Sequence, residues 1–181
     1  GLPDGRIVLS PRSLQPIYNP KVIVEAFSQV AARTPDVHLV MLSLYEGPHD
    51  LGVLPVPDRI HIVGHVPYDA MPDYLRAADV CVSVPSSDGS PRTVWESMAC
   101  GTPVVLSDLA WVDLELDRAT DALVVPIDPA AIADAVSRLL DHPAEAAAMA
   151  ASARARAVAT RDVRSEMDRL AALIRGVVTA A

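Results

Sequence analysis

The sequence predicts an α/β fold in which helices cover both faces of a parallel sheet. Short runs of β-branched and other apolar residues alternate along the chain with longer stretches of helical periodicity. The apolar runs are nearly continuous, which is typical of strands that are buried on both faces. Aromatic residues make up only 4% of the chain, so Ala, Val and Leu must fill most of the core, as in layered α/β packing.

Six strands and six helices are expected along the 181 residues. The strands are predicted at residues 6–10, 37–43, 59–63, 79–84, 103–106 and 122–125. The helices are predicted at residues 21–33, 68–78, 91–100, 129–140, 144–159 and 163–177. Gly101 follows the third helix, at a position where glycine commonly ends a helix. This order of elements is Rossmann-like, and the length suits one domain with a six-stranded sheet.

Charge and hydropathy exclude several classes of partner. The formal net charge is −8 and no basic stripe is present, so nucleic-acid binding is not expected. No apolar run reaches the roughly 20 residues of a membrane span, and no signal peptide is visible. Cys81 and Cys100 both lie among apolar residues, which predicts two buried free thiols rather than a disulfide or a metal site.

Ligands of such sheets bind beyond the carboxyl ends of the strands, near the point where the strand order reverses. The loops to consider are therefore residues 10–20, 43–58, 64–68, 84–92 and 107–113. In loop 84–92, Ser90 suits a helix N-cap and Pro91 suits the first helical position. The amides of Arg92, Thr93 and Val94 would then be free donors, and a helix start of this kind is a plausible phosphate site.

Two acidic residues flank this turn, and each has an ordinary alternative. Asp88 precedes the helix, Glu96 lies one turn beyond Arg92, and carboxylates are strong acceptors for paired sugar hydroxyls. Arg92 and Glu96 are also spaced to form a surface ion pair, and Asp88 followed by Gly89 is a common turn dipeptide. Gly89 permits a backbone geometry or a close approach that a side chain would block.

Residues 88–105, D-G-S-P-R-T-V-W-E-S-M-A-C-G-T-P-V-V, resemble the donor-site motif of GT-B glycosyltransferases. The similarity is to family 4, glycosyltransferase group 1, whose usual form is E-G-x-(P/G)-x-x-x-x-E-A-M-A-x-G-x-P-V-V. The resemblance implies retaining transfer from a nucleotide-sugar, with no cofactor and no metal. Asp88 stands where the family usually has glutamate, and its shorter arm bears on sugar specificity.

The resemblance also implies a role for each residue of the motif. Glu96 would bind the ribose hydroxyls, and Asp88 would contact hydroxyls of the transferred sugar. The loop residues Gly89, Ser90 and Pro91 would shape the turn. The backbone amides of Arg92 and Thr93 would face the diphosphate or the sugar.

Outside the motif, residues 7–12 resemble the family's first strand and its arginine. Arg12 would neutralise the donor pyrophosphate, a task that suits the fork of a guanidinium. The family usually adds a lysine about five residues later, but here Tyr18 falls at that position. Lys21, the only lysine of the chain, lies three residues further on and is a candidate substitute. Residues 60–68 resemble the strand end where the backbone around Val66 would contact the base.

The two tryptophans have structural alternatives. Trp95 is expected in the core. Trp111 lies in loop 107–113, where it either lines the sugar pocket or packs against the protein.

The resemblance covers nearly the whole chain and implies the C-terminal half of a GT-B fold. Residues 1–181 would form a single donor-binding domain, and the N-terminal domain that binds the acceptor is absent from this chain. The isolated chain is therefore expected to be inactive, and the whole enzyme to be cytoplasmic, with no membrane contact from this half. Alternatives are a non-catalytic nucleotide-sugar-binding module, and a sugar-nucleotide epimerase or phosphorylase of the same architecture.

Overall fold

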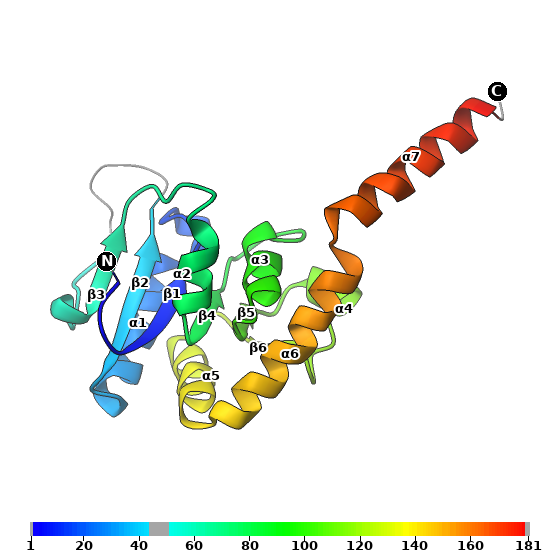
Figure 1. Cartoon of the computed structure of the whole chain (residues 1–181). Helices are drawn as coiled ribbons and strands as arrows, with labels where there is room; N and C mark the ends of the chain where they lie inside the picture. The colour runs from blue at the N-terminus through cyan, green and yellow to red at the C-terminus, as the bar shows by residue number, and fades with distance from the viewer. Residues whose placement is uncertain (1, 44–50, 180–181) are drawn as a thin grey trace.

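The sheet has the parallel architecture that the sequence predicts. The computed structural model describes residues 2–43 and 51–179. The strands are β1 (Arg6–Ser10), β2 (Val37–Leu42), β3 (Ile60–Val63), β4 (Val80–Ser83), β5 (Val104–Ser107) and β6 (Leu123–Val125). All neighbours pair in parallel, in the order β3-β2-β1-β4-β5-β6 (Figure 1). The α/β, Rossmann-like prediction is confirmed.

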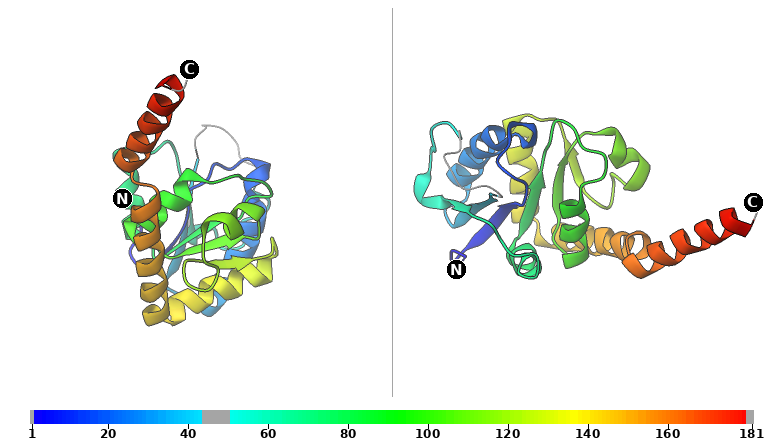
Figure 2. Two further views of the ribbon diagram at one scale, coloured as in Figure 1. Left: turned by 90° about the vertical axis from the view of Figure 1, so that its right-hand side faces the viewer. Right: turned by 90° about the horizontal axis from the view of Figure 1, so that it is seen from above.

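Helices cover both faces of this sheet. They are α1 (Pro20–Arg33), α2 (Met71–Ala77), α3 (Arg92–Cys100), α4 (Ala110–Glu115), α5 (Pro129–Asp141), α6 (Pro143–Thr160) and α7 (Val163–Thr179). Two short 3-10 turns, η1 (Pro16–Tyr18) and η2 (Pro57–Arg59), lie in the loops. Helices α1 and α5 pack together on one face, while α2 and α3 cover the other and α6 packs on α3 (Figure 2).

Side chains that alternate in direction along each strand form a hydrophobic core on both faces of the sheet. Val8 of β1 packs with Phe27 of α1 on one face, while the neighbouring Leu9 packs with Leu75 of α2 on the other. Successive side chains of a strand point to opposite faces, so a strand that is apolar throughout is buried on both sides. Leu9 is 0% exposed, as this arrangement requires.

Several predicted boundaries differ from the structure. The second helix begins at Met71 rather than at residue 68, which leaves residues 64–70 as a loop beyond β3. Helix α4 was not predicted, because six residues are too few for a clear periodicity. Residues 44–50 of the expected loop 43–58 lie outside the described residues.

The expectations for Gly101 and for the cysteines had different outcomes. Gly101 ends α3 in the left-handed conformation with φ 81°, as predicted. Cys81 is a buried free thiol, and burial raises its pKa to about 12. The prediction that Cys100 is buried was wrong, since it lies on the last turn of α3 and is only half-buried.

The C-terminal helix α7 extends away from the other elements (Figure 1). Val163, Met167, Leu170 and Ile174 are exposed along it. Within residues 2–43 and 51–179, no helix combines the length and the apolar character that crossing a membrane needs.

The strand order reverses between β1 and β4. From β1 the chain moves outward through β2 to β3, then returns to place β4 on the other side of β1. The loops that follow β1 and β4 therefore diverge on either side of the switch point, where α/β sheets bind ligands.

Candidate functional site

Arg12, from the loop after β1, meets the loop after β4. Its Nη2 donates to Asp88 Oδ2 at 2.8 Å, and its Nη1 donates to Thr93 Oγ1 at 3.1 Å. The Arg12 and Asp88 side chains are 15% and 16% exposed. The structure thus brings together three of the residues that the sequence assigns to one site.

Tyr18, at the position where the family usually has a lysine, supports this arginine. The Cζ atom of Arg12 lies 4.4 Å from the centre of the Tyr18 ring, a distance at which a cation is attracted to the ring face. A tyrosine here adds no charge, but it restricts where the guanidinium can point.

Asn19, the residue after Tyr18, links this segment to the β4–α3 loop by hydrogen bonds. Its backbone is left-handed, with φ 52°, and its Nδ2 donates to Val84 O at 2.8 Å and to Ser86 Oγ at 2.9 Å. The Ser86 amide in turn donates to Ile17 O at 2.8 Å. Sequence reasoning missed Asn19, although Asn tolerates the left-handed conformation better than most residues and stands directly before a helix that begins with proline.

Helix α3 begins one residue later than predicted. Pro91 is the N-cap and makes no side-chain capping bond, and Arg92 is the first helical residue. The Val94 amide bonds to Pro91 O at 3.1 Å, so the expectation that it is free was wrong. The amides of Arg92 and Thr93 have no acceptor in the part of the chain that the structure describes. Two donors at the start of α3 therefore remain available to an anion.

Ser90 is not the N-cap, because its hydroxyl is engaged elsewhere. Trp95 Nε1 donates to Ser90 Oγ at 3.0 Å, and Ser90 Oγ donates to Glu115 Oε2 at 2.8 Å. Glu115 Oε1 is 2.6 Å from Nη2 of Arg161, whose guanidinium lies 4.4 Å from the centre of the Trp95 ring. These four residues, Ser90, Trp95, Glu115 and Arg161, form a closed ring of contacts, which we call the Ser90 ring.

Gly89 does not need to be glycine for the fold. Its φ is not left-handed, and a Cβ built there would meet no atom within 4 Å. Of the two roles expected for Gly89, a special backbone geometry or a close approach, the structure does not support the first. Its amide donates to Asp88 Oδ1 at 2.8 Å, a turn contact that coexists with the Arg12 ion pair. A close approach by a ligand remains a prediction.

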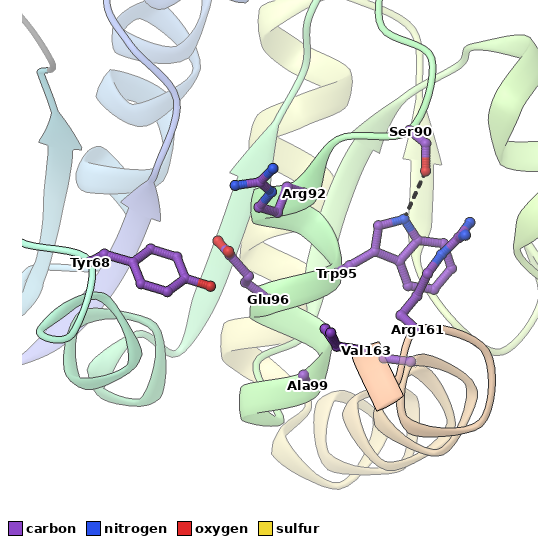
Figure 3. A pocket seen from close by; sticks show the side chains of 9 residues that line it. Tyr68, Ser90, Arg92, Trp95, Glu96, Ala99, Arg161 and Val163 are labelled. Carbon is purple, nitrogen blue, oxygen red and sulfur yellow. Dashed lines mark hydrogen bonds between the residues drawn. The ribbon is translucent and has the colours of Figure 1, made fainter. Parts of the chain in front are cut away.

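Glu96 lines a cavity of about 500 Å³ beside α3 (Figure 3). Its Oε1 atom is buried and has no hydrogen-bond partner among the described residues. Burial raises the pKa of Glu96, while the charge of Arg92 and the hydroxyl of Tyr68 oppose that rise. No ion pair or hydrogen bond joins Arg92 to Glu96, so the surface-pair alternative was wrong. Glu96 therefore lines the cavity with a carboxylate whose buried Oε1 is unsatisfied.

Val66 and Lys21 lie at the margins of this arrangement. The Val66 side chain is 8% exposed and packs with Leu9 and Leu75 under α2, which fixes the loop beyond β3. Lys21 is exposed on the first turn of α1. The side-chain contacts of Arg12 are with Asp88, Thr93 and Tyr18, and the role of Lys21 remains a prediction.

Both tryptophans are buried. Trp95 is 7% exposed, as expected for the core, but it also lines the cavity beside Glu96. Trp111 is 6% exposed and packs within the α3 side of the core, which favours the packing alternative over a sugar-pocket wall. Among the described residues, no group of three His, Cys, Asp or Glu side chains could hold a metal ion.

Comparison with known proteins identifies the family. Residues 5–142 match the sequence profile of Glycosyl transferases group 1. The chain belongs to this family. A D-inositol 3-phosphate glycosyltransferase of Xylanimonas cellulosilytica is 34% identical over 169 residues, which cover 86% of this chain and 39% of that protein. D-inositol 3-phosphate glycosyltransferase 2 of Catenulispora acidiphila is 30% identical over 155 residues, or 78% of this chain and 36% of that protein. The chain spans less than half the length of both relatives.

Solved structures agree on the fold. Sucrose-phosphate synthase from Thermosynechococcus elongatus superposes with a TM-score of 0.88 at 25% identity, covering 99% of this chain and 47% of that one. HepE of Anabaena, solved in complex with UDP-glucose, superposes with a TM-score of 0.85 at 18% identity, covering 96% of this chain and 49% of that one. The sheet and its helices therefore correspond to about half of a GT-B glycosyltransferase.

Proposed function

We propose that this chain is the donor-binding domain of a retaining glycosyltransferase that transfers a sugar from a nucleotide-sugar to an acceptor. One observation carries the proposal: the loops after β1 and β4 bring Arg12 to the first turn of α3, the helix that carries Glu96. Membership of the glycosyltransferase group 1 family and the UDP-glucose bound to HepE support a ligand of this kind.

In this proposal, Arg12 and the N-terminus of α3 bind the diphosphate. Arg12 and the amides of Arg92 and Thr93 converge at the start of α3, where a helix favours negative charge. When the bond between the anomeric carbon and the phosphate oxygen breaks, the leaving diphosphate gains charge. Donors that are already in place stabilise that charge more than they stabilise the ground state. We propose that they serve this purpose without a metal ion.

The two carboxylates would recognise hydroxyls. Glu96 has an unpartnered oxygen at the cavity and would accept hydrogen bonds from the ribose. Asp88 would exchange its contact with Arg12 for hydroxyls of the transferred sugar. Gly89, Ser90 and Pro91 would hold the loop between them.

The acceptor would bind to a separate N-terminal domain of the whole enzyme. The whole enzyme would use nucleotide-sugars of the cytoplasm to build a glycan, a polysaccharide or a glycolipid. The isolated chain would then bind donor but form no product. Incubation with nucleotide-sugars and an acceptor extract is expected to give none, and efficient transfer by the chain alone would contradict this division of labour.

Calorimetric titration with UDP, GDP and ADP tests the donor site. At least one of them is expected to bind, and Arg12→Ala and Glu96→Ala are each expected to weaken that binding roughly tenfold or more, as for a lost charged hydrogen bond. Arg33→Ala and Glu25→Ala, at exposed positions on α1, are matched controls and should bind as the parent chain does. Binding that survives in both site variants, or no binding to any of the three, would refute the proposal.

A further inference from the structure

Tyr68 is exposed where an aromatic ring would ordinarily be buried. Its side chain is 75% exposed, although burial of such a ring contributes strongly to stability. The other described Phe, Trp and Tyr side chains are at least partly covered: Tyr18, Phe27, Tyr74, Trp95 and Trp111. Exposure of a single ring is common on protein surfaces, so the case for a ligand depends on what lies beside this one.

The backbone holds Tyr68 at the carboxyl end of the sheet. The residue follows β3, two positions after the buried Val66, which anchors the loop in the core. The Met71 amide donates to Tyr68 O at 3.3 Å and to Pro67 O at 3.2 Å as α2 begins. The ring is therefore presented from a fixed loop, on the side of the sheet where ligands bind.

The Glu96 carboxylate of α3, whose Oε1 has no hydrogen-bond partner among the described residues, lies across the cavity from this ring. Tyr68, Arg92 and Glu96 line the same cavity, and the Tyr68 hydroxyl points toward the Glu96 carboxylate (Figure 3). The buried Glu96 Oε1 has no hydrogen-bond partner among the described residues, and the Tyr68 ring is 75% exposed, so the acceptor and the aromatic face both remain open to a ligand. A nucleoside supplies a counterpart to each, because it carries a ribose diol beside a flat base.

We propose that Tyr68 stacks on the base of the bound nucleotide while Glu96 holds the ribose of the same molecule. This inference rests on the proposed function and adds a specific residue to it. Every base has a planar face, so stacking adds affinity without choosing between bases. Tyr68 would therefore strengthen the binding of any nucleoside diphosphate and would leave the diphosphate contacts at Arg12 unchanged.

The test compares a nucleoside diphosphate with a ligand that has no base. Calorimetry on the full chain would use whichever of UDP, GDP and ADP binds most tightly, and inorganic pyrophosphate as the second probe. Tyr68→Ala is expected to weaken nucleotide binding roughly tenfold, as for loss of a stacked ring, and to leave pyrophosphate binding unchanged. Tyr68→Phe keeps the ring and is expected to bind the nucleotide within about twofold of the parent chain.

Each outcome separates this inference from the function on which it rests. Nucleotide binding that is equal in Tyr68→Ala and the parent chain overturns the stacking role and leaves the donor site intact. A loss in Tyr68→Phe as large as in Tyr68→Ala also overturns it, since the hydroxyl would then be the important group. Absence of binding by the parent chain to all three nucleotides refutes the proposed function, and the inference with it. Because the ring is exposed, thermal unfolding of both variants should match that of the parent chain.

Discussion

Asp88 forms an ion pair with Arg12, with 2.8 Å between the carboxylate Oδ2 and the guanidinium Nη2. The two residues that sequence reasoning assigned to different parts of the donor are thus each other's partner before a donor arrives. A diphosphate that binds Arg12 must compete with a carboxylate that is already there. We therefore expect Asp88 to lower the affinity of the site for simple anions while it keeps the guanidinium in position.

The first prediction follows from this competition. Asp88→Asn removes the competing charge, so inorganic pyrophosphate is expected to bind roughly tenfold more tightly, in line with the strength of a charged hydrogen bond. Asp88→Glu, which keeps the charge, is the matched control and should show no such gain. Titration calorimetry at two salt concentrations measures the difference, and equal affinities for Asp88→Asn and the parent chain would show that the ion pair does not restrain Arg12.

The second prediction concerns Glu96 and pH. Burial raises the pKa of this carboxyl in the folded chain, so the folded state favours the protonated form. The associated stability is present below the pKa of the unfolded chain and is lost as the pH rises through the folded pKa. Glu96→Gln is therefore expected to raise the melting temperature at pH 7, and this gain should shrink as the pH falls toward about 4. Thermal unfolding of both proteins across that range checks the sign, and a gain that grows in acid would contradict it.

The third prediction concerns the Ser90 ring. Trp95→Phe removes the indole donor to Ser90 Oγ but keeps an aromatic ring near Arg161, and Ser90→Ala removes the acceptor. A double-mutant cycle, read by urea unfolding, is expected to give a coupling energy of about 1 kcal/mol for this hydrogen bond. A coupling energy near zero would mean that the two side chains contribute to stability independently.

The fourth prediction separates the backbone and side-chain roles of Asn19. Asn19→Ala loses the bonds to Val84 O and Ser86 Oγ, and it also places a methyl group on a left-handed residue. Asn19→Gly loses the same bonds without that strain. We expect the alanine variant to be less stable than the glycine variant by about 1 kcal/mol, as the conformational preference of L residues implies. Equal unfolding free energies for the two variants would show that the backbone conformation relaxes.

Much of the fold could be predicted because its signals are local. A buried parallel strand such as β2 is mostly apolar, and Gly101 adopts the left-handed conformation that commonly ends a helix. The motif at residues 88–105 correctly predicted Asp88 in the loop before one helix and Glu96 within that helix. Arg12 reached the same place because β1 and β4 are neighbours at the switch point.

What could not be predicted depends on contacts between distant residues. Ser90 is a favourable N-cap by local chemistry, but Trp95 and Glu115 engage its hydroxyl, and the cap moves to Pro91. Arg161 enters the cavity only because α6 packs across α3. Nothing in the local pattern around residue 161 indicates that contact, and the exposure of Tyr68 is equally a property of the folded chain.

The position of Arg12 and Asp88 in the loops that follow the two central strands, β1 and β4, has a consequence for folding. These residues are 76 positions apart in sequence and become neighbours only when β1 and β4 pair in the middle of the sheet. A nucleotide bound as proposed would contact Arg12 after β1 and the loop after β4, and would so hold the two halves of the sheet together. Such a ligand binds the native state alone and so raises the melting temperature of the domain as a whole. A fragment that ends before β4 would keep the arginine and lose the ability to be stabilised in this way.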